Sequence, residues 1–380
     1  MTIYLLLLVI IILLGSAKYF LYTEKYCKYF DIIIIALLIF FIGARNEVGG
    51  DWENYLLQYN EFKNVGFPSV NLFTSSDPIY IIINILSYKI GTGYVGTNII
   101  CATIFYFGFY KLTKEYKNTL LSLIVVFLPL AIIVSAGYTR QSVSLGFVFF
   151  FIHYFIEKRY ILSCTFVALS VLSHKSVTFF ILFFFIIFSA NLIKNNKDDI
   201  KKIIQNNLKV ILLSATFIFP LVFYVLQSDI SRLLNIYVTT ENQYPVSTSI
   251  KQIITSAGLI FKYPFTLLVS FTYYIFRKKF NFKNNNEIII FDTFFILNLA
   301  VMPFLGFFSL LIDRLLVFTY IFPALIVGKF FGIIKKKYEL LLYLLISICA
   351  IFFTIVWFKF ANHSQHWIPY KNSIINLKNF

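Results

Sequence analysis

Long apolar runs separated by short polar loops are the feature that most constrains the fold of this 380-residue chain. Apolar residues make up 59% of the sequence and charged residues 13%, whereas an ordinary soluble domain is about 45–50% apolar. No soluble fold of this length has enough interior to bury so much apolar surface. We therefore expect neither a soluble enzyme, nor a disulfide-stapled secreted module, nor a disordered protein. The composition predicts an all-α polytopic integral membrane protein.

A helix that crosses a membrane needs about 20 mostly apolar residues, and the sequence offers about twelve such segments. The predicted spans are residues 2–22, 29–44, 94–111, 119–135, 139–156, 160–173, 175–193, 208–227, 252–276, 287–309, 314–333 and 339–358. The stretch 77–90 is shorter, opens with Asp77-Pro78 and ends before Gly91, and we interpret it as re-entrant or interfacial. The first run has no basic residue before Lys18, so we expect a retained span rather than a cleaved signal peptide.

The lysine and arginine residues give the expected orientation of the spans. Alternate loops hold 19 of these residues on one side and 10 on the other. The positive-inside rule makes the richer side cytoplasmic and places both termini outside. Anchoring thus explains the net charge of +16, and nucleic-acid binding is not expected. Within one transmembrane domain covering 1–380, the outer face then carries an amphipathic segment at 45–93, a loop at 228–251 and a tail at 359–380.

Arginine is distributed differently from lysine. Four of the six arginines fall on the predicted outer side, namely Arg45, Arg140, Arg232 and Arg314. The planar guanidinium suits bidentate contact with phosphate or carboxylate, for which the ammonium of lysine is less suited. The asymmetry therefore indicates an anion-binding role on the outer side, with chance in a small sample as the alternative.

The segment 43–55 follows the second predicted span and combines charges, adjacent glycines and aromatic residues. Gly49-Gly50 permits a tight turn or a close approach of the backbone to a ligand. We consider two interpretations equally: Arg45 and Asp51 bind a ligand, or the segment is a membrane-interface belt with solvated charges.

Arg140 is the strongest single candidate for a functional residue. It follows Tyr138-Thr139 at the outer start of the predicted span 139–156. The positive end of the helix dipole disfavours a cation there by about 0.3–1 kcal/mol, unless an anion is bound. Because helix N-termini hold phosphate readily, we expect Arg140 to bind an anion. The alternative is an arginine that extends to lipid headgroups.

Two further outer elements carry ionisable side chains. Ser173-His174-Lys175-Ser176 interrupts the apolar stretch 160–193 and is predicted to form an outer turn. His174 could exchange a proton near neutral pH, or it could be structural. Asp313-Arg314 is predicted to begin another inward-running helix with Asp313 as its N-cap, and a local ion pair is the alternative.

The remaining sequence motifs argue against several classes of function. The cytoplasmic loops contain no P-loop, glycine-rich nucleotide turn or DxD motif, so an enzyme using ATP or a sugar nucleotide is not expected. His363 and His366 have no evident third ligand, and the four cysteines are scattered, so we expect no metal and no cofactor. Asp292 is the only clear mid-membrane acid, which disfavours an ion-coupled transporter.

At these residues the sequence resembles the EpsG family of bacterial exopolysaccharide proteins, which belongs with the Wzy-type O-antigen and capsule polymerases. The resemblance rests on elements that follow one another over nearly the whole chain. They are Arg45–Tyr55 as an R-x-x-x-G-x-D-x-x-x-Y-like element, Tyr138-Thr139-Arg140-Gln141, Ser173-His174-Lys175-Ser176, Asp313-Arg314 and Trp367-x-Pro369-Tyr370.

The resemblance implies a glycosyl transfer at the outer face of the bacterial cytoplasmic (inner) membrane. A growing glycan would move from undecaprenyl diphosphate onto a new lipid-linked repeat unit. Cations at the outer helix starts would neutralise charge developing on the diphosphate, namely Arg140, Lys175 and Arg314. Arg45 could hold the diphosphate or orient the acceptor lipid. The candidates for a base are Asp51, Glu47 and His174, and Gln141, Arg232 and Tyr370 are further expected substrate contacts.

Two other functions remain open at this point. A ligase that attaches finished polysaccharide to a lipid core would use the same donor. A lipid-linked oligosaccharide flippase or other transporter would place its cations in a cavity reachable from both sides. The expected partners are undecaprenyl-diphosphate-linked oligosaccharide and polysaccharide, membrane lipids and a chain-length regulator protein.

Overall fold

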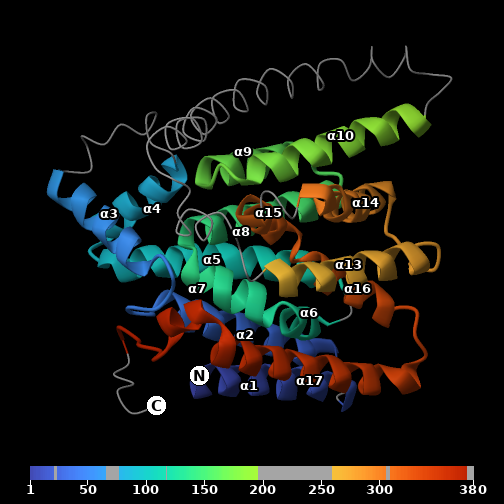
Figure 1. The fold of residues 1–380 in the computed structure, drawn as a ribbon, viewed down its shortest axis with the longest axis horizontal. Helices are drawn as coiled ribbons and strands as arrows, with labels where there is room; N and C mark the ends of the chain where they lie inside the picture. Colours follow the sequence, from blue (N-terminus) through green and yellow to red (C-terminus); the bar gives the residue numbers. More distant parts are fainter. Residues whose placement is uncertain (21–23, 66–76, 117, 196–258, 305–308, 375–380) are drawn as a thin grey trace, which may run out of the picture.

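The computed structural model describes residues 1–20, 24–65, 77–116, 118–195, 259–304 and 309–374. Every secondary-structure element within these ranges is helical, and an antiparallel bridge between Arg45 and Asn372 is isolated. The longer helices run side by side as a bundle, with their turns gathered at its two ends (Figure 1). The predicted span 208–227 and the loop 228–251, which includes Arg232, lie outside the described residues.

Ten helices form the body of the bundle in the described ranges. They are α1 (Thr2–Phe20), α2 (Glu24–Gly43), α5 (Gly93–Thr113), α8 (Thr139–Ile156), α9 (Tyr160–Ser173), α10 (Val177–Asn195), α13 (Leu259–Phe276), α14 (Asn285–Ala300), α16 (Phe322–Phe331) and α17 (Lys336–Phe360). Shorter elements connect or flank them, namely α3 (Trp52–Val65), α4 (Pro78–Ile90), α6 (Thr119–Val125), η2 (Phe127–Val134), α7 (Ser135–Gly137), η3 (Met302–Phe304), α15 (Ser309–Leu316), η4 (Val317–Thr319) and η5 (Asn362–Trp367).

Three stretches of helix are long and apolar enough to cross a membrane, judged on length and composition within the described residues. They are Gly93–Thr113, Ile312–Phe331 and Lys336–Phe360. A bent pair, Thr119–Val125 with Phe127–Gly137, makes a fourth if the two helices are counted as one span. The all-helical, apolar class is thus confirmed for the described part of the chain, and the number of twelve spans stays a prediction.

The predicted span 119–135 is bent rather than straight. The helix Thr119–Val125 and the stretch Phe127–Gly137 are bent by 78° relative to each other. Pro129 lies just after the break. Proline has no N–H group and its ring clashes with the preceding turn, and the chain responds with the π-helix η2. The π-helix leads directly into α7 and then into the start of α8, where Arg140 lies.

The stretch 77–90 forms the 13-residue helix α4, as its bounding residues suggested. Pro78 occupies the first helical turn, where its missing N–H costs nothing. Gly91 ends the helix in the left-handed region at φ +79°. The re-entrant or interfacial placement of α4 stays a prediction.

The C-terminal tail folds back onto the loop that follows α2. Trp367 is buried, and its Nε1 donates to the carbonyl oxygen of Ile132 at 3.2 Å. The N–H of Gly49 donates to the carbonyl oxygen of His366 at 2.8 Å. A Cβ atom on Gly137 would lie 2.4 Å from the Trp367 ring, so this close packing requires glycine. The tail, the 43–51 loop and α7 therefore meet at one end of the bundle, where α3 and α4 also lie (Figure 1). We call it the α3 end.

A buried ion pair ties helices together at the opposite end of the bundle. Glu287, at the start of α14, accepts from Lys329 Nζ at 2.8 Å and from the Tyr116 hydroxyl at 2.9 Å. Lys329 also donates to the carbonyl oxygen of Asn281 at 2.7 Å. This network fixes the loops that the sequence predicts to be cytoplasmic.

Candidate functional site

Polar side chains from four separate segments meet at the α3 end. Arg140 Nη1 donates to Asp77 Oδ2 at 2.6 Å, and His174 Nδ1 lies 3.9 Å from Asp77 Oδ1. The Arg140 guanidinium lies over the Tyr55 ring, 5.1 Å from its centroid. The Tyr55 hydroxyl donates to Asp51 Oδ2 at 3.4 Å. We call Asp51, Tyr55, Asp77, Arg140 and His174 the Arg140 cluster.

The start of α8 positions Arg140 as the sequence predicts. Tyr138 is the N-cap residue, and its side chain makes no capping hydrogen bond to the first turn. The first N–H groups of α8 therefore keep the partial positive charge of a helix N-terminus, and Arg140 adds a full charge beside them. This combination favours an anion at the same position.

The predicted turn at 173–176 is confirmed. α9 ends at Ser173, and His174 adopts an extended backbone at φ −163° and ψ 121° that stops the helix. α10 begins at Val177, three residues later. His174 and Lys175 therefore lie in the turn between the two helices.

Asp77 was not among the residues singled out from the sequence. It precedes α4 and is 5% exposed, and its partners lie 63 and 97 residues further along the chain. Burial alone would raise the pKa of Asp77, but the contacts with His174 and Arg140 outweigh burial and hold the pKa below its ordinary value. The carboxylate is therefore ionised at neutral pH.

This lowered pKa predicts how the acid stability of the protein depends on Asp77. A carboxyl group whose pKa is lower in the folded state stabilises the fold above its ordinary pKa of 3.8, and the effect is lost as the pH falls through the lowered value. We expect the melting temperature of Asp77→Asn in detergent to lie below that of the unmodified protein between pH 7 and about pH 4. The difference in melting temperature should then narrow as the pH falls further. Glu53→Gln, at an exposed position on α3, should have the same melting temperature as the unmodified protein. A gap that stays constant down to about pH 3 would contradict the assignment.

Arg140 retains capacity for further ligands. Its Nε atom is buried and has no hydrogen-bond acceptor within the part of the chain that the structure describes, and its side chain is 28% exposed. Guanidinium carries five N–H donors, and the hydrogen bond to Asp77 Oδ2 uses one of them. An incoming phosphate oxygen could therefore be bound without breaking the contact with Asp77.

The guanidinium of Arg45 is engaged by groups of the protein itself. It is 1% exposed, and its guanidinium donates to the carbonyl oxygens of Ile42 at 2.7 Å and Val48 at 3.3 Å. Its third contact is to Thr139 Oγ1 at 3.0 Å. The side chain thus ties the end of α2 to the start of α8, and we do not place it in contact with substrate.

The prediction that Asp313 caps a helix is wrong. α15 begins at Ser309, so both Asp313 and Arg314 lie inside it, because the helix extends back through the apolar residues 310–312. Asp313 accepts from Lys262 Nζ at 2.9 and 3.0 Å rather than from its neighbour. Arg314 is in the last turn of α15, but the chain continues through η4 into α16, so Arg314 also lies at the start of the apolar stretch Ile312–Phe331.

Arg314 lies near the Arg140 cluster. Gln141 Nε2 donates to the carbonyl oxygen of Arg314 at 3.3 Å. Burial raises the pKa of Tyr138, the carboxylates of Asp51 and Asp313 add to the rise, and the charge of Arg314 opposes it. The hydroxyl of Tyr138 is therefore protonated at neutral pH and lies within the electrostatic reach of both groups.

Two other sequence candidates lie away from the cluster. Glu47 is exposed and forms an ion pair with Lys371 of the tail. Tyr370 is buried, its ring stacks on Phe41 with 4.1 Å between centroids, and its hydroxyl donates to the Phe41 carbonyl oxygen at 2.5 Å. Both residues hold the tail against the loop after α2.

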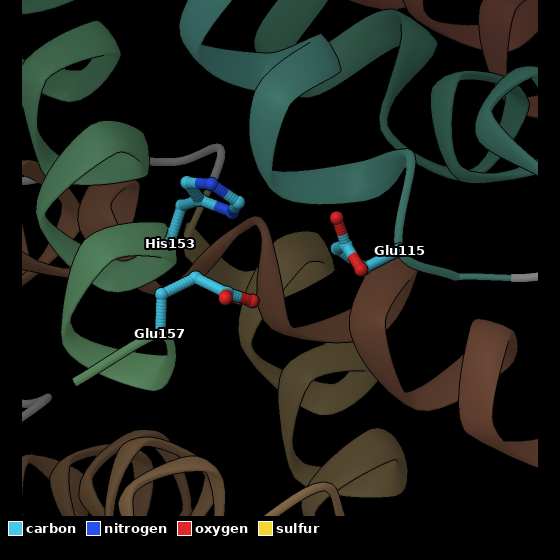
Figure 2. A group of neighbouring side chains, drawn as sticks. All are labelled: Glu115, His153 and Glu157. Carbon is cyan, nitrogen blue, oxygen red and sulfur yellow. The ribbon is translucent and has the colours of Figure 1, made fainter. Parts of the chain in front are cut away.

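A second group of ionisable side chains occupies the other end of α8 (Figure 2). The side-chain ligand atoms of Glu115, His153 and Glu157 all lie within 4.8 Å of one another. His153 and Glu157 are one helical turn apart, a spacing that could have been noticed, whereas Glu115 comes from the loop after α5. The ammonium of Lys283 pairs with Glu157 and lies 3.8 Å from Glu115. The three residues could offer ligands to a metal, but Lys283 already supplies a positive charge there.

The fold and the comparison with known families now identify the class of protein. The described residues form an all-helical bundle in which three or four helices are long and apolar enough to cross a membrane, and a charged cluster lies at one end of it. Residues 28–372 match the EpsG family, so the chain belongs to that family, which is a family of Wzy-like polymerases. The matched range contains all five residues of the Arg140 cluster. No curated protein and no solved structure matches the chain.

Proposed function

We propose that the protein is a polysaccharide polymerase of the bacterial cytoplasmic membrane. It transfers a growing glycan from undecaprenyl diphosphate onto a new lipid-linked repeat unit at the extracytoplasmic face. The observation that carries this proposal is Arg140, a partly exposed guanidinium whose Nε has no acceptor among the described residues, next to a helix N-terminus in a chain of the EpsG family.

The chemistry of the donor fits this arrangement. When the glycosidic bond to the carrier breaks, negative charge develops on the diphosphate. Arg140 and the N–H groups at the start of α8 are positioned to stabilise that charge, and the adjacent turn brings Lys175 to the same end of the bundle. Such stabilisation by preorganised donors is commonly the largest single contribution to catalysis.

Of the three candidates for a base, His174 has the strongest support. Its Nδ1 lies 3.9 Å from a buried carboxylate, an arrangement that orients an imidazole for proton transfer. Asp51 already accepts a hydrogen bond from Tyr55, and Glu47 is paired with Lys371 at an exposed position.

The charge distribution supports placing the cluster outside. The cluster lies at the α3 end, and the loops predicted to be cytoplasmic from their lysine content lie around the opposite end of α8, where Glu157 and Lys283 pair. With both termini outside and about twelve spans, the positive-inside rule gives this orientation. The partners of the reaction are lipid-linked glycans and membrane lipids, and we expect a chain-length regulator to act with the protein. No cofactor is needed because the lipid diphosphate is itself the activated leaving group.

The lipid-linked glycans of a strain lacking this protein, resolved by size, test the proposal. We expect carriers with a single repeat unit to accumulate on the outer leaflet while longer chains disappear. Long chains that are still made but fail to reach a lipid core would instead indicate a ligase. Repeat units retained on the inner leaflet would indicate a flippase.

A further inference from the structure

The two carboxylate oxygens of Asp77 serve different partners. Oδ2 accepts the short hydrogen bond from Arg140 at 2.6 Å, and Oδ1 is the atom nearest His174 Nδ1 at 3.9 Å. The carboxylate is buried, whereas the side chains of Arg140 and His174 are each 28% exposed. The buried carboxylate of Asp77 therefore contacts two partly exposed side chains, those of Arg140 and His174.

The position of Asp77 in the chain would suit a purely local role, which the structure does not bear out. Aspartate is among the best N-cap residues, and Asp77 stands at the N-cap of α4. Yet its side chain makes no capping hydrogen bond to that helix. Its carboxylate is directed instead to α8 and to the turn after α9.

We propose that Asp77 is a positioning residue for His174 in the transfer reaction. The proposal rests on the proposed function and adds to it the group that sets the orientation of the base. The ionised carboxylate, 3.9 Å from Nδ1, favours the neutral imidazole with its proton on Nδ1, which leaves the lone pair on Nε2. Asp77 also keeps Arg140 beside His174, so the proton acceptor and the anion-binding group have a fixed separation.

The bond changes that follow are simple. An acceptor hydroxyl oxygen bonds to the anomeric carbon of the donor glycan, and the bond from that carbon to the phosphate oxygen breaks. The bonding electrons leave with the lipid diphosphate, whose added charge faces Arg140. The hydroxyl proton passes to His174 Nε2, and Asp77 stabilises the resulting imidazolium. His174 then returns the proton to solvent.

A double-mutant cycle on the full-length protein in membranes tests this role, with lipid-linked repeat units as substrate. General-base catalysis contributes about 10²–10⁴-fold, so we expect His174→Ala to lower kcat by at least about 100-fold. Asp77→Asn should lower kcat by at least about 10-fold and change KM by less than about 3-fold, because it acts through the base. Asp77→Asn combined with His174→Ala should be no slower than His174→Ala alone.

The split between kcat and KM separates positioning from a structural role. The charged groups described around His174 are Asp77 from the start of α4, Arg140 from the start of α8, and its neighbour Lys175. A positioning role lowers the kcat of the folded protein, whereas a structural role lowers the amount of folded protein and leaves kcat per folded molecule unchanged. Glu53→Gln, at an exposed position on α3, should leave both kcat and KM unchanged.

Three results would overturn the proposal. They are additive effects of the two substitutions, a KM that rises more than kcat falls in Asp77→Asn, and unchanged activity in either single variant. Failure of the proposed function is distinct from all three, because the unmodified protein would then make no polymer. If Asp77→Asn does not accumulate as folded protein, Asp77→Glu in the same assay replaces it, and an unchanged kcat would equally count against the role.

Discussion

Replacing Arg140 with alanine is expected to leave folded protein in the membrane and to abolish chain lengthening. The side chain is partly exposed. Its loss removes the hydrogen bond to Asp77 and the cation over the Tyr55 ring, while His174 still faces the Asp77 carboxylate, so we expect a less stable protein that still folds. Removing a single donor that stabilises developing negative charge typically costs about 10²–10³ in rate. Cells carrying Arg140→Ala should therefore accumulate single lipid-linked repeat units.

Size-resolved glycans from cells carrying each variant measure this effect. Arg140→Lys is the matched variant, because it keeps the charge and loses the planar fork. We expect it to give short chains in reduced amount. Chains of normal length from Arg140→Ala would remove Arg140 from the mechanism.

Replacing Arg45 with alanine is expected to have the opposite effect, namely loss of the folded protein itself. The substitution leaves the carbonyl oxygens of Ile42 and Val48 and the hydroxyl of Thr139 without their donor. Each buried polar group left without its partner costs about 1–3 kcal/mol. The three contacts join the end of α2 to the start of α8, so their loss should also displace Arg140.

Thermal unfolding in detergent and the yield of monodisperse protein measure the stability of Arg45→Ala beside Arg140→Ala. We expect Arg45→Ala to melt well below the unmodified protein and Arg140→Ala to melt between the two, because the buried Asp77 carboxylate then loses its closest cation. An Arg45→Ala protein that is as stable as the unmodified chain but inactive would instead indicate that Arg45 binds substrate.

The two arginines illustrate what sequence alone can and cannot resolve. The position of Arg140 at a helix start could be predicted because the apolar run 139–156 fixes where that helix begins. Arg45 looked equally available, but its decisive contacts depend on Thr139, 94 residues away, and on how the tail covers the loop after α2. The local sequence pattern is a good predictor of where a helix ends. It is a poor predictor of which side chains become buried, because burial depends on packing between distant segments.

The same limit explains the residue that was missed and the helix that was misplaced. The local sequence predicts that Asp77 is a helix N-cap. Only the tertiary fold brings its carboxylate to Arg140 and His174. The local sequence likewise predicts that Asp313 is an N-cap, yet its carboxylate pairs with Lys262 of α13. In both cases a distant cation determines the contacts of an aspartate that local rules assign to its own helix.

Reconstitution of the purified protein in lipid vesicles with lipid-linked repeat units tests the central claim most directly. The measurement is the size distribution of the glycans on the carrier lipid, for the unmodified protein and for Arg140→Ala. We predict a ladder of long chains from the unmodified protein and single repeat units from the variant, with no nucleotide added. Single units from both proteins, or equal ladders from both, would contradict the account.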